Sequence, residues 1–395
     1  MSYLSEHNYD GYTKKRLYKR VWFRIIVAII VILIIAGGVF AWKTGSIVNK
    51  ISEGGLFNSI VHSIPGVKNE LKGESEGRIN VLLLGMRGEN IPGGGLLADT
   101  IMVLSIEPKE NKVAMISVPR DLYVTVPGTS DKQKINAVNS YGEQKGKGQG
   151  LEDMKTVVSE VLGIPIHYAV SINFEGFKQL VDAVGGIEIT LKEPFSEPLQ
   201  FEEAQVCDPN VFTIPTGKYQ IKKDNKTGKI VAQYPLCTNP QKECGGEFNL
   251  PAGKQTLDGS QALCYVRSRK TSSDFERAKK QQVILQLLKD KLTSAGTLTD
   301  FNKVNGILNA LGDNVRSDMQ AWEMKRFYDI YSGMANFQIY QRVLEDSEEG
   351  LLYHPTDTAK EVGYILLPRG DSYDRIHEMA NNIFSLPAQS DIKPK

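Results

Sequence analysis

The stretch "INVLLLGMRGENIPGGGLLADTIMVLSIEPKENKVAMISV", residues 79–118, decides the fold of this chain. It holds three apolar runs, at residues 79–85, 100–106 and 112–118, and turn-forming residues separate them. Strands that are apolar at nearly every position are typical of a sheet that is covered on both faces. The polar segment "EPKENK", residues 107–112, predicts a hairpin between the second and third runs.

Helical patterns follow these strands. Residues 151–162 form one stretch, which "GIP" ends, and residues 174–184 form another, which Gly185 and Gly186 end. The next run, "IEITL" at residues 187–191, returns to a strand pattern. This alternation predicts an α/β or α+β domain with a central mixed β-sheet flanked by helices.

An uncharged apolar segment precedes this domain. Residues 25–42, "IIVAIIVILIIAGGVFAW", are just long enough to span a bilayer core of roughly 30 Å. Basic residues exceed acidic ones before it, which predicts a cytoplasmic N-terminus and an extracellular remainder. A cleaved signal peptide is the alternative, but the run is longer than a usual signal core, and "AWKTGS" is a poor cleavage site. The sequence therefore predicts a single-pass protein of the cell membrane.

Composition divides the chain into five segments. They are a cytoplasmic tail (residues 1–24), a transmembrane anchor (25–42), a stalk (43–78), the main extracellular domain (79–385) and a disordered tail (386–395). Within the domain, residues 193–253 are polar and rich in proline and glycine, which predicts an insertion lobe or a lid on the substrate side.

Four cysteines follow the predicted anchor. They are Cys207, Cys237, Cys244 and Cys264. Their spacing matches no zinc site, and an even number in an extracellular domain predicts disulfides. Three pairings are possible, and the sequence does not choose among them.

A basic run raises the question of a partner. The segment "YVRSRKTSSDFERAKKQQ", residues 265–282, holds six cations and only two acids. The whole chain has 47 basic and 46 acidic residues and a net charge of +1, so no overall field attracts a nucleic acid. A domain outside the membrane would not meet one either. The run is therefore a local anion site or a solvated surface.

The spacing within this run suits a phosphate site. Arg267 and Arg269 are two residues apart, so on an extended segment both side chains would point the same way. The pair "SD" at residues 273–274 offers an N-cap for a helix that runs to about residue 292. Arg277 and Gln281 would share one face near its N-terminus, where the helix dipole favours an anion.

Common enzyme signatures are missing from the sequence. The glycine-rich loop at residues 85–100 has neither the G-K-[ST] ending of a P-loop nor the G-x-G-x-x-G spacing of a dinucleotide fold. No G-x-S-x-G sequence follows a predicted strand, as a nucleophile elbow would, and the five histidines form no i, i+4 pair. These absences argue against a Ser-His hydrolase and a zinc hydrolase.

Acids and arginines recur where strands begin and end. Asp99 directly precedes one strand, and Arg120 and Asp121 follow another. Guanidinium groups bind phosphate oxygens in bidentate fashion, and carboxylates can hold the Mg²⁺ that neutralises the remaining charge. We therefore expect a diphosphate site that joins these residues to the basic run.

Three blocks of sequence together resemble the LytR-CpsA-Psr family of membrane-anchored glycopolymer transferases. They contain "INVLLLG" with "ADTIMVLSIEPKENKVAMISVPRDLYVTVPG" (residues 79–128), "KINAVNSYG" with "VLGIPIHYAVSINFEGFKQLVDAVGGIEI" (134–189), and "LDGSQALCYVRSRKTSSDFERAKKQQ" (257–282). The order and spacing of the blocks make the resemblance specific. It covers about residues 79–292, with a helical tail to about residue 385.

The resemblance implies an enzyme that takes a glycan from a polyprenyl-pyrophosphate carrier, with Mg²⁺ as cofactor. The glycan would be joined by a phosphodiester to peptidoglycan or to another surface glycan or protein. By position, it implies catalytic roles for Arg120, Asp121, Arg267 and Arg269, further pyrophosphate contacts from Arg277 and Gln281, and metal contacts from Asp99 and Asp274. Asp121 would orient Arg120 or act as a base for the acceptor hydroxyl. The lipid tail is expected in an apolar cavity between the sheet and the helices at residues 151–184.

Two positions depart from the family pattern. Arg87 stands where the family usually has Asp, so Arg87 is expected to contact phosphate or Glu89 to hold the metal. The Arg that commonly precedes the family's "SDT" block is missing in "GLLADT". With an altered metal site, the alternatives are a non-catalytic scaffold or regulator that binds polyprenyl phosphates, and a lipid pyrophosphatase.

Overall fold

A computed structural model describes residues 69–89, 95–197, 205–207, 214–224, 227–238, 248–268, 273–294, 301–334, 337–347, 350–355 and 363–386. The predicted cytoplasmic tail and membrane anchor, residues 1–42, lie outside these ranges. Within the ranges given, none of the helices combines the length and the apolar character that crossing a bilayer requires.

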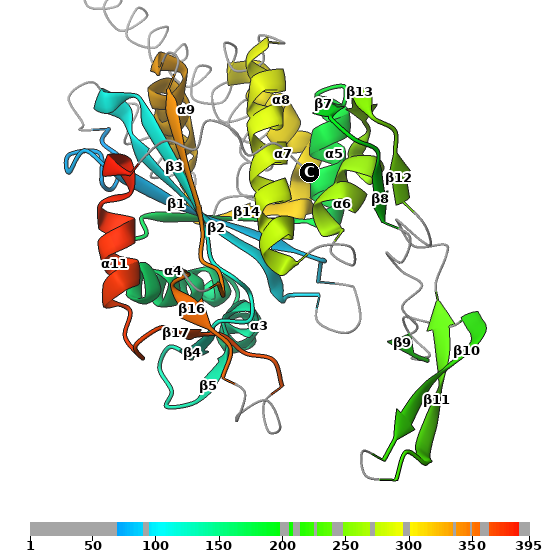
Figure 1. Cartoon of the computed structure of the whole chain (residues 1–395). Helices are drawn as coiled ribbons and strands as arrows, with labels where there is room; N and C mark the ends of the chain where they lie inside the picture. The colour runs from blue at the N-terminus through cyan, green and yellow to red at the C-terminus, as the bar shows by residue number, and fades with distance from the viewer. Residues whose placement is uncertain are drawn as a thin grey trace, which may run out of the picture. The chain divides into compact units, whose positions relative to one another are not determined.

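A six-stranded mixed sheet forms the centre of the molecule (Figure 1). Its order is β14-β6-β1-β2-β3-β15, made by β1 (Ile79–Met86), β2 (Ala98–Glu107), β3 (Lys112–Ser117), β6 (Tyr168–Asn173), β14 (Val315–Ser317) and β15 (Gln338–Val343). The pairs β1–β2 and β2–β3 are antiparallel, whereas β1–β6 and β3–β15 are parallel. The prediction of a central mixed sheet, including its hairpin, is confirmed.

Helices cover both faces of this sheet, because alternate side chains of its strands point to opposite sides. Leu82 and Leu84 pack with one group of helices, whereas Val81 and Leu83 pack on the other face. The first group is α3 (Ile135–Lys145), α4 (Gln149–Leu162) and α11 (Asp374–Asn381). The second is α5 (Phe174–Ala183), α6 (Gly259–Arg267), α7 (Asp274–Ser294), α8 (Phe301–Leu311) and α9 (Ala321–Gly333). Helices α4 and α5 confirm the two predicted helical stretches.

The caps of α6 and α7 explain where the basic run changes structure. Asp258 and Gln261 form a capping box, in which the Asp258 side chain accepts from the Gln261 N–H at 2.8 Å. Helix α6 starts at this cap and runs to Arg267. The prediction that Arg267 lies on an extended segment is therefore wrong. Ser273 caps α7, as predicted, because its hydroxyl accepts from the Glu276 N–H at 3.1 Å.

Short strand pairs complete the body. They are β4 (Tyr123–Thr125) with β5 (Lys132–Lys134), β7 (Ile187–Leu191) with β13 (Gly253–Leu257), β8 (Phe195–Glu197) with β12 (Phe248–Leu250), and β16 (Leu352–Tyr353) with β17 (Leu367–Pro368). Three 3₁₀ turns lie at Pro108–Glu110, Gly312–Asn314 and Ile383–Ser385. Strand β7 confirms the strand predicted at residues 187–191.

The insertion at residues 193–253 holds a sheet of its own. Strands β9 (Gln205–Val206), β10 (Ile214–Lys223) and β11 (Ile230–Thr238) pair in the order β10-β11-β9. A disulfide joins Cys207 to Cys237, which selects one of the three pairings that the sequence left open. We call strands β9 to β11 the arm.

Candidate functional site

Three strand ends meet at one edge of the central sheet. Because β1–β2 and β2–β3 are antiparallel, the end of β1, the start of β2 and the end of β3 lie together. Arg87 follows β1, Asp99 is the second residue of β2, and Arg120 follows β3. Gly85 pairs with Thr100 at this edge, and a Cβ on Gly85 would lie 2.9 Å from the Cβ of Thr100. The glycine thus lets the two strands approach closely beside Asp99.

The junction between α6 and α7 faces the same edge. Arg267 is the last residue of α6, and Arg277 and Gln281 lie in the first two turns of α7. All three line one cavity together with Asp99, which confirms that Arg277 and Gln281 share a face. The positive end of the α7 dipole adds to the attraction for an anion there. Arg269, predicted as a second clamp residue, lies outside the described residues.

Arg120 is the centre of the ion pairs at this edge. Its Nη1 donates to Asp99 Oδ1 at 2.8 Å, its Nε lies 3.5 Å from Asp121 Oδ2, and its Nη2 lies 3.7 Å from Asp274 Oδ2. Burial disfavours the charge on Arg120, but the three carboxylates outweigh that cost and raise its pKa above the ordinary value. Two predicted metal ligands, Asp99 and Asp274, are thereby held on one guanidinium group.

Asp121 has a second cation that the sequence reasoning did not identify. The ammonium group of Lys134, at the end of β5, donates to Asp121 Oδ1 at 2.7 Å. Asp121 therefore lies between Lys134 and Arg120, and its carboxylate is engaged on both sides. This geometry suits a residue that orients Arg120.

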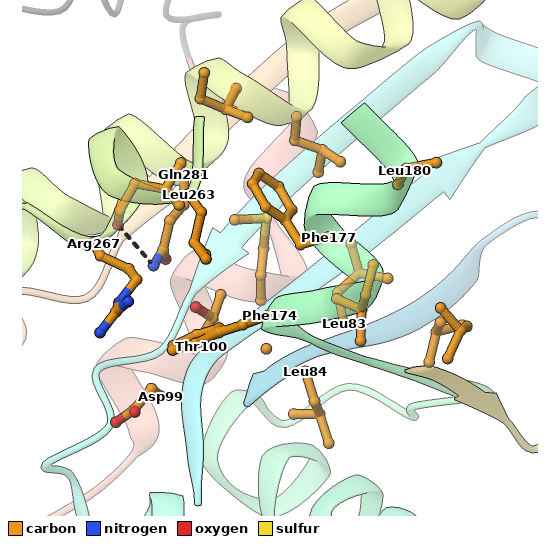
Figure 2. Close-up of a pocket in the computed structure, with 18 of the residues that line it drawn as sticks. Leu83, Leu84, Asp99, Thr100, Phe174, Phe177, Leu180, Leu263, Arg267 and Gln281 are labelled. Atoms are coloured by element: carbon orange, nitrogen blue, oxygen red, sulfur yellow. Dashed lines mark hydrogen bonds between the residues drawn. The ribbon is translucent and has the colours of Figure 1, made fainter. Parts of the chain in front are cut away.

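An aromatic ring holds Arg267 in place. The guanidinium carbon lies 4.4 Å from the centre of the Phe174 ring, a distance typical of a cation–π contact. Figure 2 shows Arg267 above this ring, with Gln281 beside it; the side chain of Gln281 donates to the carbonyl of Val266 at 3.5 Å. Phe174 begins α5, where Asn173 caps the helix through the N–H of Gly176. Sequence spacing gave no signal for the Phe174 contact.

These residues form the mouth of a cavity of about 440 Å³. Its polar groups are Arg87, Asp99, Thr100, Arg120, Arg267, Arg277 and Gln281. Its walls are apolar and come from the sheet and from α5 to α8: Leu83, Met102, Val170, Ile172, Phe174, Phe177, Leu180, Leu263, Val266, Ile284, Leu285, Leu288, Leu308, Leu311 and Val315. In Figure 2, Asp99 and Arg267 lie at one end of the drawn residues and Leu180 at the other.

The cavity corrects one expectation about its walls. The sequence placed it against both helices at residues 151–184, but only α5 lines it. The apolar residues of α4, such as Met154 and Val158, are fully buried with Leu82 and Leu84 on the opposite face of the sheet. That face is filled, so α4 contributes no wall.

The acids at the mouth suit a hard cation only in part. Asp99 and Asp274 fit Mg²⁺, which usually takes one or two carboxylates and completes its shell with phosphate oxygens and water. Among the residues described, no three His, Cys, Asp or Glu side chains lie close enough together to hold a metal ion by themselves. Glu89 forms an ion pair with Arg316, which also pairs with Glu143 at 3.5 Å. The metal contact predicted for Glu89 therefore stays a prediction.

Arg87 lies where it can neutralise Asp99. Its Nε is 3.9 Å from Asp99 Oδ2, and it lines the cavity. The cation at this position thus adds to the positive charge of the mouth. The arrangement as a whole can bind a molecule with an anionic head and a long apolar tail.

Comparison with known proteins identifies relatives over most of the chain. The model of the LytR_cpsA_psr family matches residues 51–363. The polyisoprenyl-teichoic acid–peptidoglycan teichoic acid transferase TagU of Oceanobacillus iheyensis is 28% identical over 314 residues, which are 78% of this chain and 80% of that protein. TagT of Bacillus subtilis, a transferase of the same description, is 27% identical over 349 residues, 86% of this chain and 91% of that protein.

Solved structures share the fold. TagV of Bacillus subtilis aligns with a TM-score of 0.52 at 23% identity, over 81% of this chain and 100% of that chain. A protein from Streptococcus agalactiae aligns with a TM-score of 0.54 at 20% identity, over 81% and 92%. These matches support the mixed sheet with its helical layers.

Proposed function

The chain belongs to the LytR_cpsA_psr family, and from this membership and the cavity we propose that it is a glycopolymer transferase. The donor is a glycan on a polyprenyl-pyrophosphate carrier, and the product is a phosphodiester to peptidoglycan or to another surface acceptor. Relatives described as polyisoprenyl-teichoic acid–peptidoglycan teichoic acid transferases support this proposal.

The observation that carries the proposal is the cavity with an arginine mouth and apolar walls. A diphosphate fits the mouth because Arg120, Arg267 and Arg277 present guanidinium groups there. A prenyl chain fits the walls because they offer leucine, valine, isoleucine and phenylalanine side chains over four helices and the sheet. A lipid diphosphate combines these two chemistries.

The charges at the mouth match a diphosphate ester. In the described part of the chain, the cations Arg87, Arg120, Arg267, Arg277 and Lys134 gather with the acids Asp99, Asp121 and Asp274. Five cations against three acids leave a net charge of +2. A diphosphate esterified at both ends carries one negative charge on each phosphate, so its charge is opposite in sign to the net charge of these residues.

The reaction breaks one P–O bond and forms another. The acceptor hydroxyl attacks the phosphorus next to the glycan, the bridging P–O bond breaks, and polyprenyl phosphate leaves. Phosphoryl transfer depends chiefly on positioning and charge neutralisation. Arg120, Arg267 and Arg277 hold the phosphate oxygens and stabilise the charge on the departing phosphate. Asp121, fixed by Lys134, orients Arg120, and the hydroxyl proton passes to solvent.

Mg²⁺ is part of the proposal. Asp99 and Asp274 would hold it once a diphosphate engages Arg120, and it would neutralise phosphate charge in the transition state. The remaining ligands would be phosphate oxygens and water.

The proposal also includes the location of the enzyme. Residues 25–42 anchor it in the cell membrane, with the N-terminus in the cytoplasm and the domain outside, where the acceptor lies. Extracellular trypsin should then digest the domain in intact protoplasts. Protection of the domain from trypsin would contradict this orientation.

The test is transfer by the purified full-length protein in detergent. It is mixed with a polyprenyl-diphosphate-linked disaccharide, Mg²⁺ and soluble peptidoglycan strands, and phosphodiester product is measured by mass spectrometry. Product supports the transferase. Retained lipid diphosphate without product favours the scaffold, and release of phosphate without acceptor favours a pyrophosphatase.

A further inference from the structure

A second, much smaller pocket adjoins the mouth of the cavity. Its volume is about 30 Å³, enough to admit a group the size of a water molecule. It shares Asp99, Arg120 and Arg277 with the large cavity, but Asp121 and Tyr364 line only the small one. The small pocket therefore has room for one hydroxyl group beside the same guanidinium groups.

Tyr364 presents an aromatic ring at this pocket. The residue is 45% exposed, and its ring stacks on the imidazole of His354 with the centres 4.5 Å apart. Because His354 stacks on one face of the ring, the other face is the one that a ligand could contact. Tyr364 thus combines an aromatic surface with a position on the wall of a polar pocket.

Hydrogen bonds fix this ring relative to Arg120. The N–H of Leu366 donates to the carbonyl of Asp121, and the N–H of Tyr123 donates to the carbonyl of Leu366, both at 2.9 Å. His354 Nδ1 lies 2.8 Å from the carbonyl of Ile365. The segment that follows Tyr364 is thus bonded both to the His354 side chain and to the loop that carries Arg120.

Two carboxylates, those of Asp121 and Asp274, line the small pocket with Tyr364. Burial, and then the charges of Asp346, Asp121 and Asp274, raise the pKa of the Tyr364 hydroxyl above its ordinary value. The hydroxyl therefore stays protonated as a donor, and Asp121 and Asp274 stand nearby as acceptors on the pocket wall. Sugar hydroxyls need both kinds of partner.

We propose that Tyr364, supported by His354, binds a pyranose ring of the acceptor glycan and directs one hydroxyl into the small pocket. This inference rests on the proposed transferase function. An aromatic face carries negative partial charge, which attracts the C–H groups on one side of a sugar ring. In phosphoryl transfer the attacking oxygen enters opposite the leaving group. Polyprenyl phosphate leaves with its tail in the large cavity, so the acceptor enters from the small pocket.

The test measures acceptor binding separately from transfer. Soluble, uncrosslinked peptidoglycan strands are titrated into full-length protein in detergent, and the heat of binding is recorded. Tyr364→Ala should weaken strand binding about tenfold, whereas Tyr364→Phe, which keeps the ring face and loses only the hydroxyl donor, should weaken it by about threefold or less. Tyr141→Ala is the matched control, because Tyr141 is 39% exposed and lines neither pocket.

A second measurement shows whether the variants keep their fold. Binding of a polyprenyl diphosphate should be equal in all four proteins. The inference would be overturned if Tyr364→Ala bound the strands as tightly as the wild type does. It would also be overturned if the wild type did not bind the strands. Loss of lipid binding in Tyr364→Ala would also overturn it, since the residue would then be structural. Absence of transfer by a wild type that binds both ligands would instead count against the proposed function.

Discussion

Arg120 combines two demands that a lysine could not meet. Its guanidinium group faces three carboxylates from three directions, with the nearest at 2.8 Å. A planar fork can satisfy several oxygen partners and still match a phosphate, whereas an ammonium group acts as a single point of charge. The three acids keep Arg120 charged and hold its side chain in position.

Replacing Arg120 by Lys should therefore impair transfer far more than folding. We expect kcat/KM for the lipid-linked glycan to fall by about 100-fold or more, because charge is retained but the bidentate contacts are lost. The measurement is product formation by mass spectrometry, with unfolding temperature recorded in parallel. Arg375→Lys, a change at an exposed site on α11, is the control and should keep wild-type activity. An active Arg120→Lys variant would remove Arg120 from the mechanism.

The sequence predicted which charged residues gather, but not what holds them. Asp99 and Arg120 could be placed because antiparallel neighbours bring their strand ends together. Phe174 and Arg267 are 93 positions apart in the sequence and belong to two different helices. No periodic pattern in the sequence predicts a contact between such residues. Lys134 was missed for the same reason, since its partner Asp121 lies across the β4–β5 hairpin.

The junction of α6 and α7 depends on a buried lysine. Lys280 is only 7% exposed, and its ammonium group donates to both the carbonyl and the hydroxyl of Ser268 at 2.7 Å. Ser268 ends α6 directly after Arg267 and donates its hydroxyl hydrogen to the carbonyl of Tyr265. Lys280 therefore fixes the end of the helix that carries Arg267. The charge of the basic run suggested a surface or a ligand site for this residue, since burial cannot be read from charge alone.

Folding stability should rise with pH through the titration of Lys280. Burial lowers the pKa of Lys280 from 10.5 to about 8 in the folded protein. Below pH 8 both states hold the proton and the cost of burying the charge is fully present. Between pH 8 and 10.5 the unfolded chain holds a proton that the folded one has released, so rising pH stabilises the fold by at most about 1.4 kcal/mol per unit.

The comparison with Lys280→Met isolates this effect. Free energies of unfolding are measured by urea titration at pH 7, 8.5 and 10. As the pH rises, the free energy of unfolding of the wild type should increase relative to that of Lys280→Met. Lys279→Met keeps Lys280 and alters only the neighbour that pairs with Glu276, so it should follow the wild-type pH dependence. Parallel curves for wild type and Lys280→Met would contradict the lowered pKa.

Helices α5 and α7 both line the cavity that we propose for the lipid tail. Leu180 lines the apolar end, away from Asp99 (Figure 2). We expect Leu180→Trp to weaken binding of a long polyprenyl diphosphate by about tenfold or more, because the indole occupies space that the distal tail needs. Farnesyl diphosphate, whose chain is short, should bind with little change.

A matched substitution distinguishes this steric effect from general overpacking. Leu287 lies on α7 and packs against the same apolar core but does not line the cavity. Leu287→Trp should therefore change the binding of long and short lipids to the same extent, or leave both unchanged. Equilibrium binding measurements with the two lipids test this. Equal loss of both lipids in Leu180→Trp would show that the cavity end does not receive the tail.

The molecule joins a body that carries the site to an arm with its own sheet and its own cross-link. The sequence located the arm from its composition, since polar, proline-rich segments cannot bury a core. It could not supply the strand pairing, which depends on the register between β10 and β11, nor the choice of Cys237 as the partner of Cys207. Because the Cys207–Cys237 disulfide joins β11 to the residue that follows β9, the stability of the arm is expected to depend on it.

Removing the disulfide should therefore loosen the arm and leave the site intact. The bond joins residues 30 positions apart, and closing such a loop stabilises the folded arm by about 3.6 kcal/mol. In Cys207→Ser/Cys237→Ser we expect trypsin to cleave at Lys218, Lys222, Lys223 and Lys229 at least about tenfold faster, as peptide mass spectrometry over time would show. Cleavage at Lys132, which is exposed in the body, is the internal control and should keep its rate. Binding of the lipid diphosphate should also be unchanged, because Arg120, Arg267 and Arg277 are held by contacts within the body. Loss of lipid binding in this variant would show that the arm supports the site.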